Sequence, residues 1–241
     1  MTRTALVTGG TRGIGKAISA ALVRSGFTVA ANFSGNEYAA KQCCERLGVT
    51  CFKFDVGSFE ECADGIEQIE ARLGPIDIFI NNAGITRDKP FHKMSRDHWQ
   101  QVINVDLDSA FNVTRNVWEG MRDRGFGRVI NVSSINGQKG QFGQVNYSAA
   151  KAGLIGFTKA LALEGARKGI TVNCIAPGYI NTEMVAAVPY SVRESIISSI
   201  PVGRLGETEE IAAMAAFMSS DAASFMTGAV IPVNGGQYIS G

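Results

Sequence analysis

Three side chains that can move a proton lie close together in the sequence, between Ser134 and Lys151. Tyr147 and Lys151 are four residues apart, so on a helix both side chains lie on the same face. A phenol has an ordinary pKa of about 10, and a nearby ammonium ion favours the phenolate and lowers that pKa. The Ser134 hydroxyl can donate a hydrogen bond to a carbonyl oxygen as charge develops on it. Ser134, Tyr147 and Lys151 therefore predict a catalytic site for proton transfer to a ketone.

The elements expected around these residues place them in a cleft. The β-branched run Arg128–Val132 predicts a buried parallel strand that ends just before Ser134. From Tyr147 onward, apolar residues recur at helical spacing. A Tyr-x-x-x-Lys pair alone is more often an exposed pair on a helix. Here the strand end before it, and a connecting loop with three glycines, favour a site at which the hydroxyl groups converge.

Composition and charge indicate one α/β domain over residues 1–241, because no linker or charge run divides the chain. The 23 Lys and Arg residues balance 22 Asp and Glu residues, which leaves no basic surplus for nucleic acid or anionic lipid. No apolar run approaches ~20 residues, and the five cysteines lack zinc-type spacing. We expect a cytoplasmic protein without a metal site that binds neither nucleic acid nor membranes.

A glycine-rich turn separates the first expected strand, Ala5–Thr8, from a helical pattern. Glycine lets the backbone approach a ligand closely, and a helix amino terminus offers N–H groups to a pyrophosphate. Such turns are common, but this one follows the first strand, which favours a dinucleotide site. The cofactor-binding residues expected here are Gly9, Thr11, Arg12, Gly13 and Ile14.

The end of the second expected strand, Thr28–Phe33, indicates which dinucleotide binds. An Asp or Glu at this place usually binds the ribose 2′-OH of NAD. This chain has Asn32 and Ser34 instead, which are also expected to bind the cofactor, and the Arg12 guanidinium is placed to meet a 2′-phosphate. We predict NADPH/NADP as the cofactor; the alternative is that Arg12 is only solvated.

Later strand ends supply the remaining cofactor contacts. Small residues after the fourth expected strand let a cofactor lie flat against the sheet edge, although an Asn-rich turn also fits that segment. The residues expected to bind cofactor at these ends are Asp55, Val56, Asn82, Ala83, Gly84, Ile85, Pro177, Gly178 and Ile180.

Strands and helices alternate along the whole chain. This pattern predicts a doubly wound parallel sheet, a Rossmann fold, of about seven strands with helices on both faces. A long helix is expected over Trp99–Arg122. The less regular segment 179–205 is expected to form a lid over the site.

Four motifs in this order resemble those of the short-chain dehydrogenase/reductase family, and the resemblance covers the full length. They are Thr8-Gly9-x-x-x-Gly13-x-Gly15, Asn81-Asn82-Ala83-Gly84, Ser134 and Tyr147-x-x-x-Lys151. Within the family, the segments Asn82–Asp88 and Asn136–Gln144 are most similar to those of acetoacetyl-CoA reductases. The resemblance implies that Tyr147 donates the proton, that Lys151 lowers its pKa and holds the nicotinamide ribose, and that Ser134 orients the carbonyl. Tyr147 and Lys151 thus also count as cofactor-binding residues.

The same resemblance implies an activity and an assembly. The expected reaction is NADPH-dependent reduction of acetoacetyl-CoA to (R)-3-hydroxybutyryl-CoA, as in polyhydroxybutyrate synthesis, by a homotetramer. The implied substrate-binding residues are Asp88, Lys93, Gln141, Phe142, Gln144 and Tyr179.

Two other functions remain open at this stage. One is 3-oxoacyl-acyl-carrier-protein reduction in fatty-acid synthesis, for which a basic patch would bind the acidic carrier. The residues proposed for that patch are Arg122, Arg124, Arg128, Arg167 and Lys168. The other is a catalytically silent dinucleotide-binding protein, which need not retain the three catalytic residues.

The chain departs from the family pattern at one position. The family usually has an asparagine on the long helix, and that slot, aligned on Ser109 and Phe111, holds Asp106. Asn104 is two residues earlier and on an α-helix points roughly 200° away, so it does not replace the missing amide. The family asparagine acts largely through its main-chain carbonyl, and we therefore expect the activity to be retained.

Overall fold

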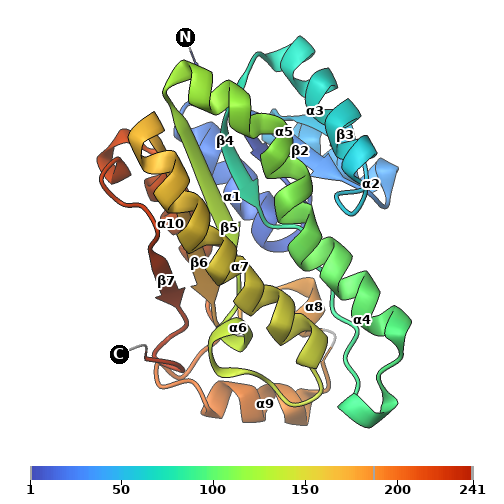
Figure 1. Ribbon diagram of the computed structural model, residues 1–241. Helices are drawn as coiled ribbons and strands as arrows, with labels where there is room; N and C mark the ends of the chain where they lie inside the picture. Colours follow the sequence, from blue (N-terminus) through green and yellow to red (C-terminus); the bar gives the residue numbers. More distant parts are fainter. Residues whose placement is uncertain (1, 187, 240–241) are drawn as a thin grey trace.

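Seven parallel strands form one sheet at the centre of the computed structural model, in the order β3-β2-β1-β4-β5-β6-β7 (Figure 1). The structure describes residues 2–186 and 188–239. Residue 187 of the predicted lid, and residues 1 and 240–241 of the predicted domain, lie outside the described residues. The strands are β1 Thr4–Val7, β2 Thr28–Phe33, β3 Thr50–Lys53, β4 Ile76–Asn81, β5 Gly127–Val132, β6 Ile170–Pro177 and β7 Val230–Val233.

Helices cover both faces of the sheet, so the predicted doubly wound Rossmann fold is confirmed. One face carries α3, α5 and α7, and the other carries α1 and α10. The helices are α1 Gly13–Arg24, α2 Glu37–Leu47, α3 Phe59–Leu73, α4 Arg96–Ile103, α5 Ser109–Arg124, α6 Ile135–Lys139, α7 Val145–Gly165, α8 Glu183–Ala186, α9 Tyr190–Ser198 and α10 Thr208–Ser219. Among the described residues, no helix combines the length and apolar character that a membrane span requires.

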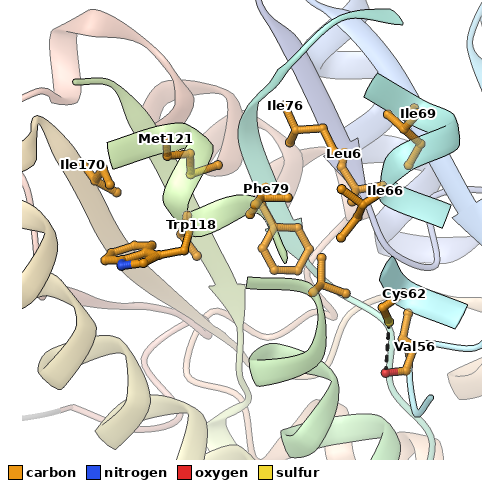
Figure 2. Close-up of a cluster of buried hydrophobic side chains, with 14 of the residues drawn as sticks. Leu6, Val56, Cys62, Ile66, Ile69, Ile76, Phe79, Trp118, Met121 and Ile170 are labelled. Carbon is orange, nitrogen blue, oxygen red and sulfur yellow. Dashed lines mark hydrogen bonds between the residues drawn. The ribbon is translucent and has the colours of Figure 1, made fainter. Parts of the chain in front are cut away.

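The first core cluster fills the space between the sheet and helices α3 and α5 (Figure 2). Leu6 and Phe79 come from neighbouring strands and are fully buried against Ile66 of α3 and Met121 of α5. Each such side chain contributes about 1.5–3 kcal/mol by leaving water. Burial on this scale holds α3 and α5 firmly against the sheet.

The second core cluster lies on the opposite face, because alternate residues of a strand point to opposite sides. Ala5 and Val7, on either side of Leu6, pack in this cluster with Ile18 of α1 and Ile211 of α10. Both faces of the central strands are therefore buried, as their uninterrupted apolar sequences require. Polar residues can reach solvent only where the strands end.

The expected helix over Trp99–Arg122 is present, but it contains a π-helical turn that the sequence pattern did not indicate. Helix α4 ends at Ile103, a π-helical turn covers Asn104–Asp108, and α5 begins at Ser109. A π-turn widens the helix by one residue and changes the directions of the side chains. Asp106 is buried in this turn, whereas the Asn104 side chain accepts a hydrogen bond from Gln100 at 2.7 Å on the exposed side.

Candidate active site

Strands β5, β6 and β7 point toward the end of the sheet at which α6, α8 and α9 lie (Figure 1). Ser133 and Ser134 follow β5 at this end and are both buried. The segment expected as a glycine loop instead contains the short helix α6. The Ser134 hydroxyl caps this helix by accepting a hydrogen bond from the Asn136 N–H at 3.1 Å.

Helix α7 presents Tyr147 and Lys151 to the same place. The helix begins at Val145, two residues before the expected start, and packs against α6. The Ser133 hydroxyl donates to the main-chain carbonyl of Lys151 at 2.7 Å, which fixes α7 to the end of β5. Lys151 is buried, its Nζ atom donates to the Val132 carbonyl at 3.2 Å, and Nζ lies 5.5 Å from the Tyr147 ring centroid. The structure therefore brings the predicted catalytic residues Ser134, Tyr147 and Lys151 together.

The charges around the phenol have opposing effects on its pKa. Burial raises the pKa of Tyr147 most, the Lys151 ammonium lowers it, the Asp106 carboxylate raises it, and a hydrogen bond with Ser134 lowers it. The expected lowering by Lys151 is present, but burial outweighs it. The phenol is consequently protonated at neutral pH, which is the form that donates a proton.

Asp106 is a residue of this site that the predicted list of site residues omitted. Its Oδ2 atom lies 3.4 Å from Lys151 Nζ, and its Oδ1 atom accepts the Ile85 N–H at 2.8 Å. Gly84 makes room for this pair, since a Cβ atom there would lie 3.0 Å from Asp106 Oδ2. The sequence did contain a signal for this role, because Asp106 stands at the position where the family usually has an asparagine.

The predicted pyrophosphate turn joins β1 to α1 and is held by the end of β4. Thr8 Oγ1 accepts the N–H groups of Asn82 and Ala83 at 3.0 and 3.1 Å. The Asn82 side chain donates back to the Thr8 carbonyl at 2.9 Å. Gly9 and Gly13 have φ values of 61° and 48°, which favour glycine. These bonds fix the turn at the point where the strand order reverses, which is where open α/β sheets bind ligands.

The turn fits a dinucleotide phosphate group. Thr11 and Ile14 are partly exposed, Arg12 is exposed, and the first turn of the 12-residue helix α1 contains no acidic residue. A helix amino terminus of this kind attracts anions.

The end of β2 holds the two residues that were expected to select the cofactor. Asn32 is buried; its Oδ1 atom accepts the Gly9 N–H at 3.3 Å and its Nδ2 atom donates to the Phe54 carbonyl at 2.9 Å. The amide therefore supports the turn. Ser34 is exposed beyond the strand end.

The other predicted cofactor residues also follow strand ends. After β3, Asp55 accepts the Gly57 N–H at 2.9 Å, and Val56 is buried. Pro177 is the last residue of β6, the Gly178 N–H donates to the Val233 carbonyl at 2.9 Å, and Ile180 forms a parallel bridge with Gly206. Together these residues border one edge of the sheet.

Two of the predicted substrate residues bind each other directly. The Gln144 amide donates to Asp88 at 2.7 Å and its oxygen accepts from the Asn136 amide at 2.9 Å. Burial raises the pKa of Tyr179 and the nearby Asn136 side chain lowers it, so Tyr179 lies close to the same group. Asn136 was not predicted as a site residue, although it opens the loop motif that carried the resemblance.

The remaining predicted substrate residues lie at the surface. The Phe142 side chain is 86% exposed, and Gln141 and Lys93 are exposed as well. In the part of the chain that the structure describes, none of the three makes a side-chain hydrogen bond. The structure thus joins Asp88, Gln144 and Tyr179 but leaves Lys93, Gln141 and Phe142 outside that group.

The segment predicted as a lid contains α8 and α9 and is anchored at its first residues. The Gly206 N–H donates to the Tyr179 carbonyl at 3.0 Å, and the Asn181 N–H donates to the Gly206 carbonyl at 2.7 Å. A hollow of about 280 Å³ lies between α9 and residues 203–207, and neither Ser134 nor Tyr147 lines it. No group of metal-ligating side chains is found within residues 2–186 and 188–239.

The parallel sheet, the glycine turn at its switch point and the Ser-Tyr-Lys cluster define an oxidoreductase of the short-chain dehydrogenase/reductase family. The profile described as enoyl-(acyl carrier protein) reductase matches residues 9–237, so the chain belongs to this family. Enzymes of this family use a nicotinamide dinucleotide cofactor.

Among its relatives, the chain is similar to acetoacetyl-CoA reductases. The enzyme of Shinella zoogloeoides is 61% identical over 99% of both chains, and that of Rhizobium meliloti is 61% identical over 100% of both. The 3-oxoacyl-acyl-carrier-protein reductase of Pseudomonas aeruginosa is 45% identical over 99% of this chain and 98% of its own. The predicted resemblance to acetoacetyl-CoA reductases is confirmed.

The clamp between Thr8 and the end of β4 can be tested by substitution. Thr8→Val keeps the side-chain shape but removes the acceptor for two N–H groups, and we expect the free energy of unfolding to fall by about 2 kcal/mol. Thr8→Ser keeps the hydroxyl and should lose only ~1 kcal/mol for the missing methyl group. Urea unfolding followed by circular dichroism measures both values. Equal losses in the two variants would show that the hydroxyl is unimportant.

Proposed function

We propose that this chain reduces acetoacetyl-CoA to (R)-3-hydroxybutyryl-CoA with NADPH, as in polyhydroxybutyrate synthesis. The main support is the cluster of Ser134, Tyr147 and Lys151 at the end of β5, in a chain similar over its full length to acetoacetyl-CoA reductases. The (R) configuration of the product is proposed from the same similarity.

The side chains of the cluster divide the work of ketone reduction. The Tyr147 hydroxyl donates its proton to the substrate carbonyl oxygen, and the Ser134 hydroxyl donates a hydrogen bond to the same oxygen. The Lys151 ammonium stabilises the phenolate that remains on Tyr147. Bound NADPH supplies the hydride that the carbonyl carbon receives.

The residues that would hold NADPH lie along the strand ends described above. Gly9, Thr11, Gly13 and Ile14 surround the proposed pyrophosphate position. At the adenine and nicotinamide ends, we assign cofactor contacts to Asp55, Val56, Asn82, Ala83, Gly84, Ile85, Pro177, Gly178, Ile180, Tyr147 and Lys151. The preference for NADPH is assigned to Arg12, which is exposed, and to Ser34, which replaces an acidic residue at the end of β2. Asn32 supports the glycine turn by accepting a hydrogen bond from the Gly9 N–H.

The residues around the proposed substrate entrance, here called the substrate mouth, suit a CoA thioester as the substrate. Asp88, Gln144 and Tyr179 present carboxylate, amide and phenol groups that suit the amide-rich pantetheine arm. Gln141 and Phe142 lie on the loop before α7, and Lys93 lies after β4; all three are exposed and available to a bound thioester. We further propose that segment 179–205 closes over this mouth.

The basic residues considered for an acyl-carrier protein are mostly engaged with the protein itself. Arg128 is buried and donates to the Gly127 carbonyl at 2.8 Å, and Arg124 donates to the Ile76 carbonyl at 2.7 Å. Arg122 pairs with Glu119 at 3.1 Å. These residues lie near the amino end of β5, whereas Ser134 follows its carboxyl end. This arrangement favours CoA over a carrier protein as the acyl carrier.

Apolar surface supports a homotetramer of this single-domain chain, which we propose to be cytoplasmic. Phe111 of α5 is 55% exposed and stacks on Phe59 of α3, with ring centroids 6.0 Å apart. Leu163 of α7 is 83% exposed and Phe225 is fully exposed. Large exposed apolar side chains of this kind suit contacts between subunits of a symmetric oligomer.

A comparison of kcat/KM for acetoacetyl-CoA and for acetoacetyl-carrier protein shows which acyl carrier the enzyme uses. We expect higher kcat/KM for acetoacetyl-CoA, and a roughly tenfold rise in KM for Gln144→Ala because one hydrogen bond to the thioester is lost. Gln42→Ala, on the exposed side of α2, is the matched control and should not change KM. A large preference for the carrier protein, with Gln144→Ala unchanged, would assign the chain to fatty-acid synthesis.

The role of Tyr147 as the proton donor is tested in the same assay with the variant Tyr147→Phe. Loss of the acid should lower kcat by about 10²- to 10⁴-fold while cofactor binding stays near wild type. Near-normal turnover would exclude Tyr147 as the proton donor. If the wild-type protein oxidises NADPH with neither thioester, the chain is a silent dinucleotide-binding protein.

Cofactor preference is tested with Arg12→Ala. Removing the guanidinium should lower kcat/KM for NADPH about tenfold to a hundredfold and leave NADH almost unchanged, because only the phosphorylated ribose loses a charge-assisted bond. Arg24→Ala, at the other end of α1, is the control. Equal effects of Arg12→Ala on the two cofactors would contradict the assignment.

The assembly is tested by sedimentation equilibrium. We expect a mass four times that of the 25.6 kDa chain. Leu163→Asp should dissociate the tetramer because it buries a charge in an apolar interface, while Tyr38→Asp on the exposed side of α2 should not. A monomeric wild-type protein would refute the proposal.

A further inference from the structure

The closest charged neighbour of the catalytic pair is a carboxylate that the reaction as described does not use. The Asp106 side chain is fully buried, and Lys151 is 4% exposed at 3.4 Å from it. Burying a charge is costly unless it is paired, so each of these two groups requires the other. The pair is therefore built into the site.

The carboxylate is held in one orientation. Its Oδ1 atom accepts the Ile85 N–H at 2.8 Å, whereas its Oδ2 atom has no hydrogen-bond partner within the described residues and faces Lys151. The π-helical turn Asn104–Asp108 directs Asp106 inward, and Gly84 leaves the space between the two charges open. The π-turn and the Ile85 N–H therefore hold the carboxylate with its Oδ2 atom facing the Lys151 ammonium group.

Few other titratable groups face this pair. Asp88 acts on Tyr147 from the substrate mouth, and Cys174 of β6 acts on Lys151. Both effects are smaller than that of Asp106. Asp106 therefore provides the main negative charge at the catalytic pair.

We propose that Asp106 is a positioning residue whose buried carboxylate anchors the Lys151 ammonium and keeps the Lys151–Tyr147 pair protonated until Tyr147 donates its proton to the ketone. The proposal rests on the reductase function proposed above and specifies which charge keeps Tyr147 an acid. Burial is the largest effect on the pKa of Lys151 and lowers it, but Asp106 and Tyr147 together raise it by more, and the Asp106 carboxylate also raises the pKa of Tyr147. Both effects favour the protonated pair.

The sign of the expected change does not depend on which of the two residues loses the proton. Lys151 and Tyr147 interact strongly and titrate as a pair. When Lys151 and Tyr147 are both protonated, the pair carries one positive charge. The ionised Asp106 carboxylate cancels this charge, so the three groups together are neutral, whereas without the carboxylate the positive charge remains. Proton loss from a positively charged buried group is easier. Removing the carboxylate therefore lowers the first macroscopic pKa of the pair.

The test is Asp106→Asn, which keeps the shape and the acceptor for the Ile85 N–H but removes the charge. Asp108→Asn is the matched control, because Asp108 lies on the same π-turn but is exposed. The pH dependence of kcat/KM for acetoacetyl-CoA reduction is measured for both variants and the wild type. We expect the alkaline limb of Asp106→Asn to move to lower pH by about 1 unit or more, and that of Asp108→Asn to stay in place.

A second measurement needs no substrate and separates this proposal from the proposed function. NMR titration of protein with ¹³C-labelled tyrosine and lysine follows Tyr147 and Lys151, whose signals are assigned with Tyr147→Phe and Lys151→Ala. The first proton loss of the pair should occur at lower pH in Asp106→Asn. An unchanged titration in folded Asp106→Asn overturns the role of Asp106. Absence of reductase activity in a wild-type protein with the expected titration instead overturns the proposed substrate.

Discussion

A buried ammonium ion at the carboxyl end of a parallel sheet is the constraint on which this site depends. Lys151 cannot remain charged in this position unless its surroundings replace water. The Val132 carbonyl and the Asp106 carboxylate supply that replacement from β5 and from the π-turn before α5. The direction of α7 follows from the same need, since the helix must carry the ammonium group to both acceptors.

The cofactor turn meets the site through hydrogen bonds rather than through apolar contact. Thr8 and Asn82 tie the end of β1 to the end of β4, and Asn32 ties the turn to the end of β3. These side chains occupy the narrow zone between a dry core and the open strand ends. Because each amide or hydroxyl joins two strands, the turn keeps one conformation before any ligand arrives, which reduces the entropy cost of binding.

The substrate mouth is built differently from the catalytic cluster. Gln144 is hydrogen-bonded on one side to the buried Asn136 of α6 and on the other to the exposed Asp88, and at the surface the Lys89 N–H donates to the Gly143 carbonyl at 2.9 Å. Such surface bonds exchange with water at little cost. The mouth can therefore rearrange around a thioester while Ser134, Tyr147 and Lys151 stay fixed by buried contacts.

The alternation of apolar runs and helical patterns was sufficient to predict the fold, because a strand buried on both faces and a helix buried on one leave distinct periodicities. The residue types and order of Ser134, Tyr147 and Lys151 were likewise sufficient to predict their chemistry, since a strand end and a helix start must meet at the sheet edge. Local patterns carry this information, and the family match agrees with the predicted fold.

Tertiary structure alone decided the contacts between distant segments. The π-turn and the burial of Asp106 against Lys151 depend on the packing of α4 and the π-turn against α7, which α-helical spacing in one segment does not contain. Asn32 is predicted from the sequence as a cofactor contact, whereas its hydrogen bonds to Gly9 and to the Phe54 carbonyl after β3 are visible only in the tertiary structure. The balance of burial against charge at Tyr147 is also a property of the assembled site, because desolvation depends on every element that surrounds the phenol.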